Sequence, residues 1–146
     1  MFFTDISSER GELTRAELEV DHGPARLAFS QHDVSDCAQW NQVWLRAEEF
    51  FGGEVEVLCN NAGIYETYQS TNTNIINVNL LGVAYGTNLA MEKMSVERGG
   101  RGGLIVQVAS MAGLVTTSSP RHPTMTKFLT LGVDEVDRLL RTGREL

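Results

Sequence analysis

The chain has 146 residues, of which 42% are hydrophobic and 21% charged, and its 12 basic and 19 acidic side chains give a net charge of −7. This composition is typical of a compact soluble domain and excludes fibrous and intrinsically disordered chains. The acidic balance, with no cluster of lysine or arginine, argues against nucleic acid or an anionic membrane surface as a partner. We expect a single cytoplasmic domain over residues 1–146, with no membrane helix and no targeting segment.

Cysteine and histidine residues give no sign of a disulfide framework or a metal site. Cys37 and Cys59 are far apart and form no Cys-x-x-Cys pair, so we expect reduced thiols. The histidines at positions 22, 32 and 122 have no ligand spacing to one another. No metal is predicted.

Hydrophobic periodicity, capping residues and glycine turns predict strands that alternate with helices. In chain order, the expected strands are residues 2–5, Arg26–Ser30, Glu54–Cys59 and Leu104–Val108. The first expected helix is short, follows Ser7 and stops at Gly23-Pro24, and the second is capped by Ser35 or Asp36 and stops before Gly52-Gly53. Two further helices are expected, from about Thr71 to Glu97 and from Thr124 to Arg141. This alternation indicates a parallel α/β sheet with right-handed crossovers.

Polar residues follow each of the predicted strands directly. They are Asp5, Asp33, Asn60-Asn61 and Ser110. The carboxyl ends of parallel strands meet at one edge of the sheet, and such sheets bind ligands beyond that edge. These residues are therefore expected to gather at one site.

These residues also carry a family resemblance. The chain resembles the classical short-chain dehydrogenases/reductases at Asp33-Val34 after a strand, Asn60-Asn61-Ala62-Gly63, the helical Asn79, and Ser110 followed by Ala112-Gly113. The resemblance covers about residues 1–127 and implies a Rossmann-like, doubly wound α/β fold. It further implies an oxidoreductase that transfers a hydride between NAD and a secondary alcohol or ketone, a prostaglandin-like hydroxy lipid being one candidate substrate.

The resemblance implies that NAD is held by a defined set of residues: Asp5, Ile6, His32, Asp33, Val34, Asn61, Ala62, Gly63 and Lys127. In this family the residue matching Asp5 accepts hydrogen bonds from the adenosine ribose and repels a 2′-phosphate, which favours NAD over NADP. Asp33 and Val34 match the pair that holds the adenine, and residues 61–63 let the backbone pass close to the ribose. Without the resemblance, Asp5 ends a strand, Asp33 is a turn or N-cap residue, and residues 60–63 are a plain turn.

The catalytic residues implied by the resemblance are Ser110, Lys127 and Asn79. Ser110 would bind the reacting substrate oxygen, Lys127 would bind the nicotinamide ribose, and Asn79 would hold a proton-relay water. Independently, an amide buried in the middle of a helix requires a hydrogen-bond partner. The position of the family's catalytic tyrosine holds Pro123, which has no titratable group. The general acid/base of the family is therefore absent at this position.

A second departure from the family concerns the two ends of the chain. The glycine-rich turn that receives the pyrophosphate would precede Asp5 by about twenty residues, and the chain starts at Met1. We therefore expect a truncated, incomplete sheet that lacks the first and last strands, with the order 3-2-gap-4-5. We also expect the chain alone to bind NAD weakly or not at all. The alternative function is a catalytically inactive remnant that acts as an interaction partner, with a homodimer formed through the helices around Asn79 and after Lys127.

Overall fold

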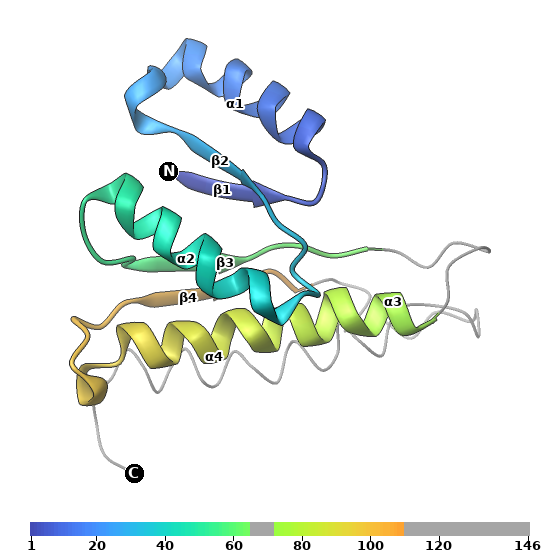
Figure 1. Ribbon diagram of the computed structural model, residues 1–146, viewed down its shortest axis with the longest axis vertical. Coiled ribbons are helices and arrows are strands. Elements are labelled where there is room, and N and C mark those ends of the chain that lie inside the picture. Colours follow the sequence, from blue (N-terminus) through green and yellow to red (C-terminus); the bar gives the residue numbers. More distant parts are fainter. Residues whose placement is uncertain (65–71, 110–146) are drawn as a thin grey trace. The chain divides into compact units, whose positions relative to one another are not determined.

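The computed structural model describes residues 1–64 and 72–109, and these form strands that alternate with helices (Figure 1). The described chain divides into two compact units, Met1–Val55 and a second unit that begins at Glu56. Each unit contains one pair of strands, and both pairs are parallel. The α/β class and the incomplete Rossmann-like sheet predicted from the sequence are confirmed. The expected helix from Thr124 to Arg141 lies outside the described residues.

The first unit contains two strands, each followed by a helix. Its elements are β1 (Phe2–Asp5), α1 (Ser8–His22), the 3-10 turn η1 (Pro24–Arg26), β2 (Ala28–Gln31) and α2 (Cys37–Phe51). β1 and β2 pair in parallel, with Phe2 opposite Ala28 and Asp5 opposite Gln31. The loops that follow these two strands therefore leave the same edge of the sheet.

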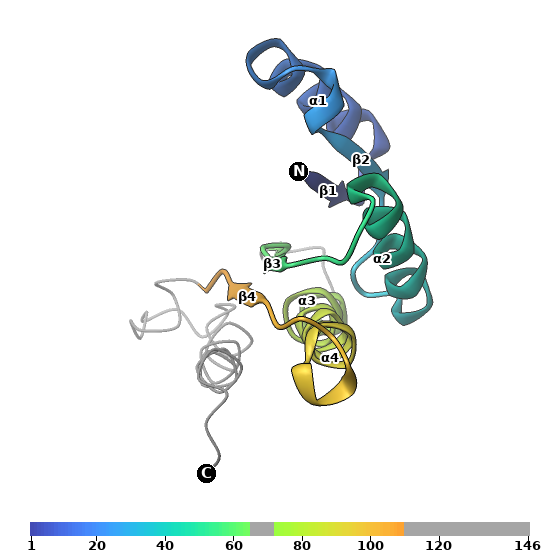
Figure 2. The ribbon, with the colours of Figure 1, turned by 90° about the vertical axis from the view of Figure 1, so that its left-hand side faces the viewer.

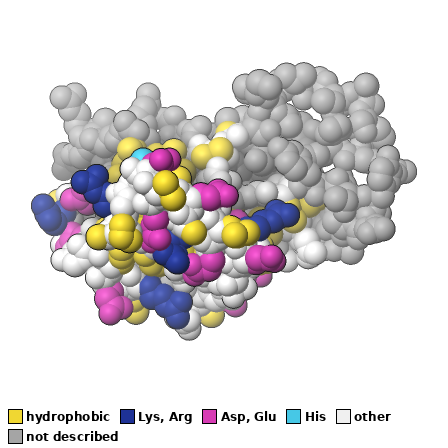
Figure 3. All heavy atoms as spheres, turned by 90° about the horizontal axis from the view of Figure 1, so that it is seen from above, with side chains coloured by type: hydrophobic (Ala, Val, Ile, Leu, Met, Phe, Trp, Pro, Cys, Tyr) yellow, Lys and Arg dark blue, Asp and Glu magenta, His cyan; other side chains and the backbone are white. Residues whose placement is uncertain are grey.

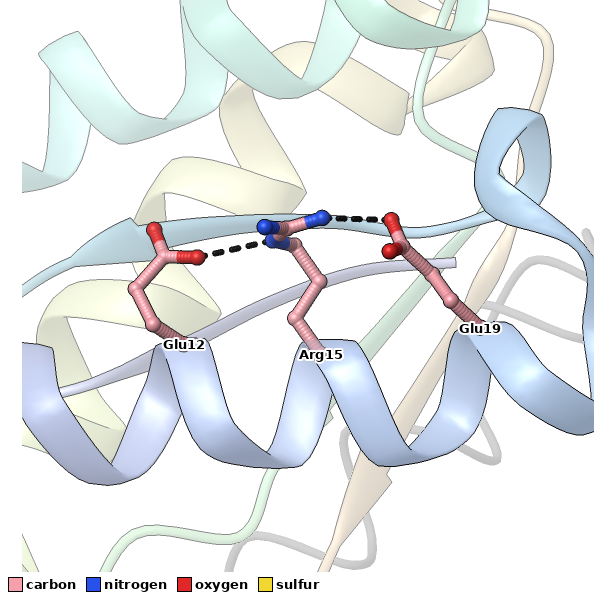
Figure 4. Close-up of polar contacts among 3 residues, drawn as sticks. All are labelled: Glu12, Arg15 and Glu19. Atoms are coloured by element: carbon pink, nitrogen blue, oxygen red, sulfur yellow. Dashed lines mark hydrogen bonds and ion pairs between the residues drawn. The ribbon is translucent and has the colours of Figure 1, made fainter.

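Helix α1 has the capping residues that its sequence predicts. The side chain of Ser7 accepts a hydrogen bond from the Arg10 amide, and Gly23 ends the helix with a φ of 81°. At the surface, Arg15 contacts both Glu12, at 2.8 Å, and Glu19 (Figure 4). Hydrogen bonds to these carboxylates, that of Glu12 first, raise the pKa of Arg15. Such surface pairs contribute little to stability, so packing must hold α1 in place.

The two faces of the β1–β2 pair contact different helices. Successive side chains of a strand point to opposite faces. On one face, the rings of Phe3 and Phe29 lie 5.4 Å apart, and Gly11 of α1 lies directly against Phe29. On the other face, Phe2 contacts Phe50 of α2, with ring centroids 6.2 Å apart. Helices thus cover both faces, as in a doubly wound sheet.

The second unit contains one parallel pair of strands and the helical segment that connects them. Its elements are β3 (Val57–Asn60), α3 (Asn72–Ile76), the π-helix η2 (Asn77–Gly82), α4 (Val83–Met94), the 3-10 turn η3 (Val96–Arg98) and β4 (Leu104–Gln107). α4 packs along both strands, as Figures 1 and 2 show from two directions. The strand face toward α4 buries Asn60 and Ile105, whereas the opposite face exposes Val57 and Val106.

Several predicted boundaries are wrong by a few residues. The strand expected at Arg26–Ser30 lies at Ala28–Gln31, because Pro24 begins a 3-10 turn that extends to Arg26. By contrast, the helix expected between Ser7 and Gly23-Pro24 has both predicted ends, and its 15 residues make it longer than the short helix expected. The helix expected from Thr71 to Glu97 is three segments that end at Met94. β3 begins at Val57 instead of Glu54, because its ladder begins opposite Leu104.

The described surface carries mixed charge. On the face shown in Figure 3, basic, acidic and hydrophobic side chains are interspersed, and neither sign of charge forms a continuous patch over the described atoms. Within residues 1–64 and 72–109, no group of three or more His, Cys, Asp and Glu side chains could hold a metal ion. Cys37 and Cys59 are free and exposed. No helix in the described ranges is both long and apolar enough to span a membrane.

Candidate functional site

Asp5 ends β1 and shapes the turn into α1. Its carboxylate accepts a hydrogen bond from the backbone N–H of Ser7 at 2.8 Å, and Ser7 in turn caps the helix. Asp5 is exposed, and so is Ile6, with 63% of its surface accessible. The carboxylate is therefore anchored in the turn and remains open to a hydroxyl group that arrives from solvent.

The loop after β2 is held by its own side chains and by those of α2. The carboxylate of Asp33 accepts two hydrogen bonds from Ser35, one from its backbone N–H at 2.9 Å and one from its hydroxyl at 2.6 Å. The backbone N–H of Asp33 donates to the side-chain oxygen of Gln39 at 3.0 Å. The indole N–H of Trp40 donates to the carbonyl of Val34 at 2.9 Å. The loop backbone is therefore fixed at two consecutive residues.

His32 lies beneath this loop and is only 2% exposed. Its ring meets Trp40 edge-on, with centroids 4.7 Å apart, and its Nδ1 lies 3.4 Å from the hydroxyl of Thr4. Its Nε2 has no hydrogen-bond partner among the described residues. Burial lowers the pKa of His32, against the opposing effect of Asp33 and Asp36. The sequence predicts His32 as a cofactor contact, and the structure buries its ring against Trp40 and Thr4 in the first unit.

The loops after β1 and β2 are also connected directly. The backbone N–H of His32 donates to the carbonyl of Asp5 at 2.9 Å, and the side-chain amide of Gln31 donates to the carbonyl of Ile6 at 3.0 Å. The first unit thus brings together five predicted site residues at one sheet edge: Asp5, Ile6, His32, Asp33 and Val34.

In the second unit, a buried threonine connects the ends of β3 and β4 to α4. The hydroxyl of Thr87 accepts from the amide of Asn60 at 3.3 Å and from the amide of Gln107 at 2.8 Å, and donates to the carbonyl of Val83 at 2.8 Å. Sequence reasoning missed Thr87 and Gln107. The available signal was a threonine among apolar residues of a helix that packs on two strands ending in amide side chains.

Asn79 connects the π-helix to the chain that follows β3. It is 2% exposed, its side-chain oxygen accepts the N–H of Ile64 at 2.8 Å, and its nitrogen donates to the carbonyl of Ile64 at 2.9 Å. The predicted need of this buried amide for a partner is confirmed. Residues 61–63, which precede Ile64, are exposed. Single turns of π-helix are frequent at functional sites.

The predicted site residues fall into three groups. One group belongs to the first unit, and residues 61–63 with Asn79 belong to the second. Ser110, Pro123 and Lys127 lie outside the described residues.

Comparison with known proteins gives consistent matches. The family model for short chain dehydrogenase matches residues 1–128. The chain is 33% identical over 111 residues to rat 15-hydroxyprostaglandin dehydrogenase [NAD(+)], covering 76% of this chain and 41% of the relative. It is 37% identical over 116 residues to the NADP-dependent (R)-specific alcohol dehydrogenase of Lentilactobacillus kefiri, covering 75% and 45%.

A solved structure agrees with these matches. The short-chain dehydrogenase/reductase of Burkholderia phymatum in complex with NAD superposes with a TM-score of 0.75 at 26% identity, covering 92% of this chain and 48% of that one. The chain spans less than half the length of each of these three proteins. The match of the family model over most of the chain, together with the parallel strands and the residues at their ends, shows that the chain belongs to the short-chain dehydrogenase family.

Proposed function

We propose that the chain is an oxidoreductase of the short-chain type, which transfers a hydride between NAD and a secondary alcohol or ketone. The observation that carries this proposal is the edge of the β1–β2 sheet, where the loops bearing Asp5 and Asp33-Val34 leave side by side. Ligands of open α/β sheets bind at this kind of edge. The short-chain family membership supplies the reaction class.

The residues at this edge fit the adenosine half of NAD. Ribose hydroxyls and the adenine amino group donate hydrogen bonds, and the carboxylates of Asp5 and Asp33 accept them. Asp5 would take the ribose hydroxyls, while Asp33 and Val34 would hold the adenine. NAD, when bound, supplies the nicotinamide carbon that takes up or releases the hydride.

The residues of the second unit would serve the rest of the reaction. Residues 61–63 would allow the backbone to approach the adenosine ribose, and Asn79, through its two bonds to Ile64, would hold that segment in place. Ser110 would polarise the substrate oxygen, and Lys127 would bind the nicotinamide ribose. A prostaglandin-like hydroxy lipid is the candidate substrate, supported by the resemblance to the rat enzyme. The single domain and the cytoplasmic location remain predictions.

A second candidate is a catalytically inactive chain that acts as an interaction partner. It is favoured by Pro123, which stands at the position of the family's catalytic tyrosine. General acid/base catalysis is typically worth about 10² to 10⁴ in rate, so a chain without it would turn over very slowly. Such a chain would act through a homodimer formed by the helices around Asn79 and after Lys127.

Two measurements on the purified chain separate these candidates. Titration with NADH, followed by its fluorescence, measures cofactor binding, which the sequence predicts to be weak or absent. NAD reduction is then measured with a panel of secondary alcohols that includes a 15-hydroxyprostaglandin. Binding with turnover supports the enzyme, and binding without turnover supports the inactive candidate. Absence of binding at millimolar NADH would contradict the cofactor site.

The same assay tests the tyrosine position. In a chain completed with the family's N-terminal and C-terminal parts, Pro123→Tyr is expected to raise alcohol oxidation by about 10²-fold or more, because it restores the acid/base. His122→Ala is the control, because the neighbouring histidine should point away from the site. A loss of activity in His122→Ala, with no gain in Pro123→Tyr, would identify the histidine as the base.

A further inference from the structure

We propose that Gln39 and Trp40, in the first turn of α2, are positioning residues that hold the loop bearing Asp33 and Val34 in the shape that receives an adenine ring. The inference rests on the proposed function and adds to it two residues that do not themselves touch the cofactor. Each of them makes a hydrogen bond to the loop backbone, and these bonds fall on the two residues assigned to the adenine.

Trp40 holds the loop at Val34. Its side chain is almost buried, with 8% of the residue exposed, and its indole N–H lies 2.9 Å from the Val34 carbonyl. The edge-on contact with the buried His32 ring, at 4.7 Å and 86°, fixes the orientation of the indole. An aromatic ring locked by packing offers its N–H in one direction only. The carbonyl of Val34 is therefore kept turned toward α2.

Gln39 holds the loop one residue earlier. Its side-chain oxygen accepts the N–H of Asp33 at 3.0 Å, and its nitrogen donates to the carboxylate of Asp36 at 2.9 Å. Asp36 also caps α2 through the Ala38 N–H at 2.9 Å. These bonds lower the pKa of Asp36, the bond from Gln39 having the largest effect. Gln39 thus connects the loop to the helix cap, and its amide has one orientation that satisfies both partners.

The consequence concerns the free energy of binding. A loop that is already ordered does not lose conformational entropy when a ligand binds. The ligand therefore binds to it more tightly than to a mobile loop. Removing either bond would release the backbone at Asp33 or Val34 without touching any group that contacts the adenine. We expect binding of an adenine nucleotide to weaken by about threefold to tenfold, the range of a single net hydrogen bond.

The test uses the full chain and AMP as the probe. Backbone amide shifts in NMR spectra are followed during AMP titration for wild type, Trp40→Phe and Gln39→Ala, at a temperature where each is folded. Trp44→Phe is the matched control for the indole, because Trp44 is buried and donates to Glu48 within α2 at 3.0 Å. Gln42→Ala, at an exposed position of the same helix, is the control for the amide. Ribose 5-phosphate reports any binding that needs no adenine.

The expected result is a threefold to tenfold rise in the AMP dissociation constant for Trp40→Phe and Gln39→Ala, with both controls within about twofold of wild type. Equal AMP affinity in all five proteins would overturn the positioning role and leave the proposed function standing. An equal loss in Trp44→Phe would also overturn it, since it would indicate a general effect on the fold. No AMP-dependent shift at Asp33 and Val34 in the wild type, or the same shift with ribose 5-phosphate, would contradict the adenine site itself, and the inference with it.

Discussion

His32 is expected to make the stability of the first unit sensitive to mild acid. Burial lowers its pKa in the folded chain, whereas the unfolded chain restores the ordinary value of about 6.5. Below that pH the unfolded state binds a proton that the folded state does not, so the free energy of unfolding falls as pH decreases. The contribution of His32 to the free energy of unfolding is constant above about pH 7. It begins to fall near pH 6.5 and continues to fall until the pH reaches the lower pKa of the folded state.

Chemical denaturation at a series of pH values measures this effect. In His32→Gln the decrease in unfolding free energy between about pH 7 and pH 5 should be smaller than in wild type. His22→Gln, at the exposed end of α1, is the control and should follow the wild-type profile. Identical profiles for wild type and His32→Gln would show that another group is responsible.

Asp5 is expected to set the choice between the two nicotinamide cofactors. Its exposed carboxylate would repel the 2′-phosphate of NADP, so Asp5→Ala should lower the preference for NAD by a factor of about three to ten. The ratio of the two dissociation constants, measured by fluorescence titration, gives the result. Asp21→Ala removes an exposed carboxylate from the far end of α1 and should leave the ratio unchanged. An unchanged ratio in Asp5→Ala would mean that Asp5 only shapes the turn.

Gly11 determines how closely α1 packs on the β1–β2 pair. A Cβ atom at this position would lie 2.0 Å from two ring atoms of Phe29, whose ring also packs against Phe3. Gly11→Ala should therefore destabilise the chain by about 1–2 kcal/mol, because overpacking outweighs the gain in helix propensity. Urea denaturation measures this, with the exposed Thr14→Ala as the control. Adding Phe29→Leu should recover part of the loss, and a stable Gly11→Ala would show that the ring moves aside freely.

At the level of elements, local signals were sufficient for some boundaries and insufficient for others. Ser7 and Asp36 are N-caps and Gly52 ends α2 in a left-handed conformation, all readable from residue type. The π-helix was not readable, because no residue type marks a single turn of this kind. The contact of its Asn79 with Ile64 was equally unreadable, since it joins residues 15 positions apart.

The candidate site shows the same division. Asp33 and Val34 were predictable because they follow a strand in a recognisable pair. Gln39 and Trp40 were not, since their positions in the amphipathic helix α2 are explained by solvent exposure and core packing alone. Their contacts depend on how the loop folds back on the helix, and no local pattern encodes that geometry.

The whole chain is proposed to dimerise through the helical segment around Asn79. Ile76, Leu81 and Met91 expose apolar surface on this segment, at 41%, 36% and 37%. If they form the contact, Leu81→Glu combined with Met91→Glu should convert a dimer to a monomer in analytical ultracentrifugation, because buried unpaired charges oppose association. Val20→Glu, on the exposed side of α1 with 84% accessibility, is the control. A monomeric wild type would contradict the proposal.

The two parallel ladders differ in the length of chain that each must close. Phe2 pairs with Ala28, whereas Val57 pairs with Leu104, so the second ladder encloses roughly twice as much chain, and each doubling adds about 0.6 kcal/mol of closure entropy. The first ladder therefore has the smaller entropic barrier. Its residues also precede those of the second ladder in the chain, so synthesis delivers them first. Chain order and closure entropy thus favour the same sequence of folding events, with the edge that bears Asp5 and Asp33 assembled before the segment that bears Asn79.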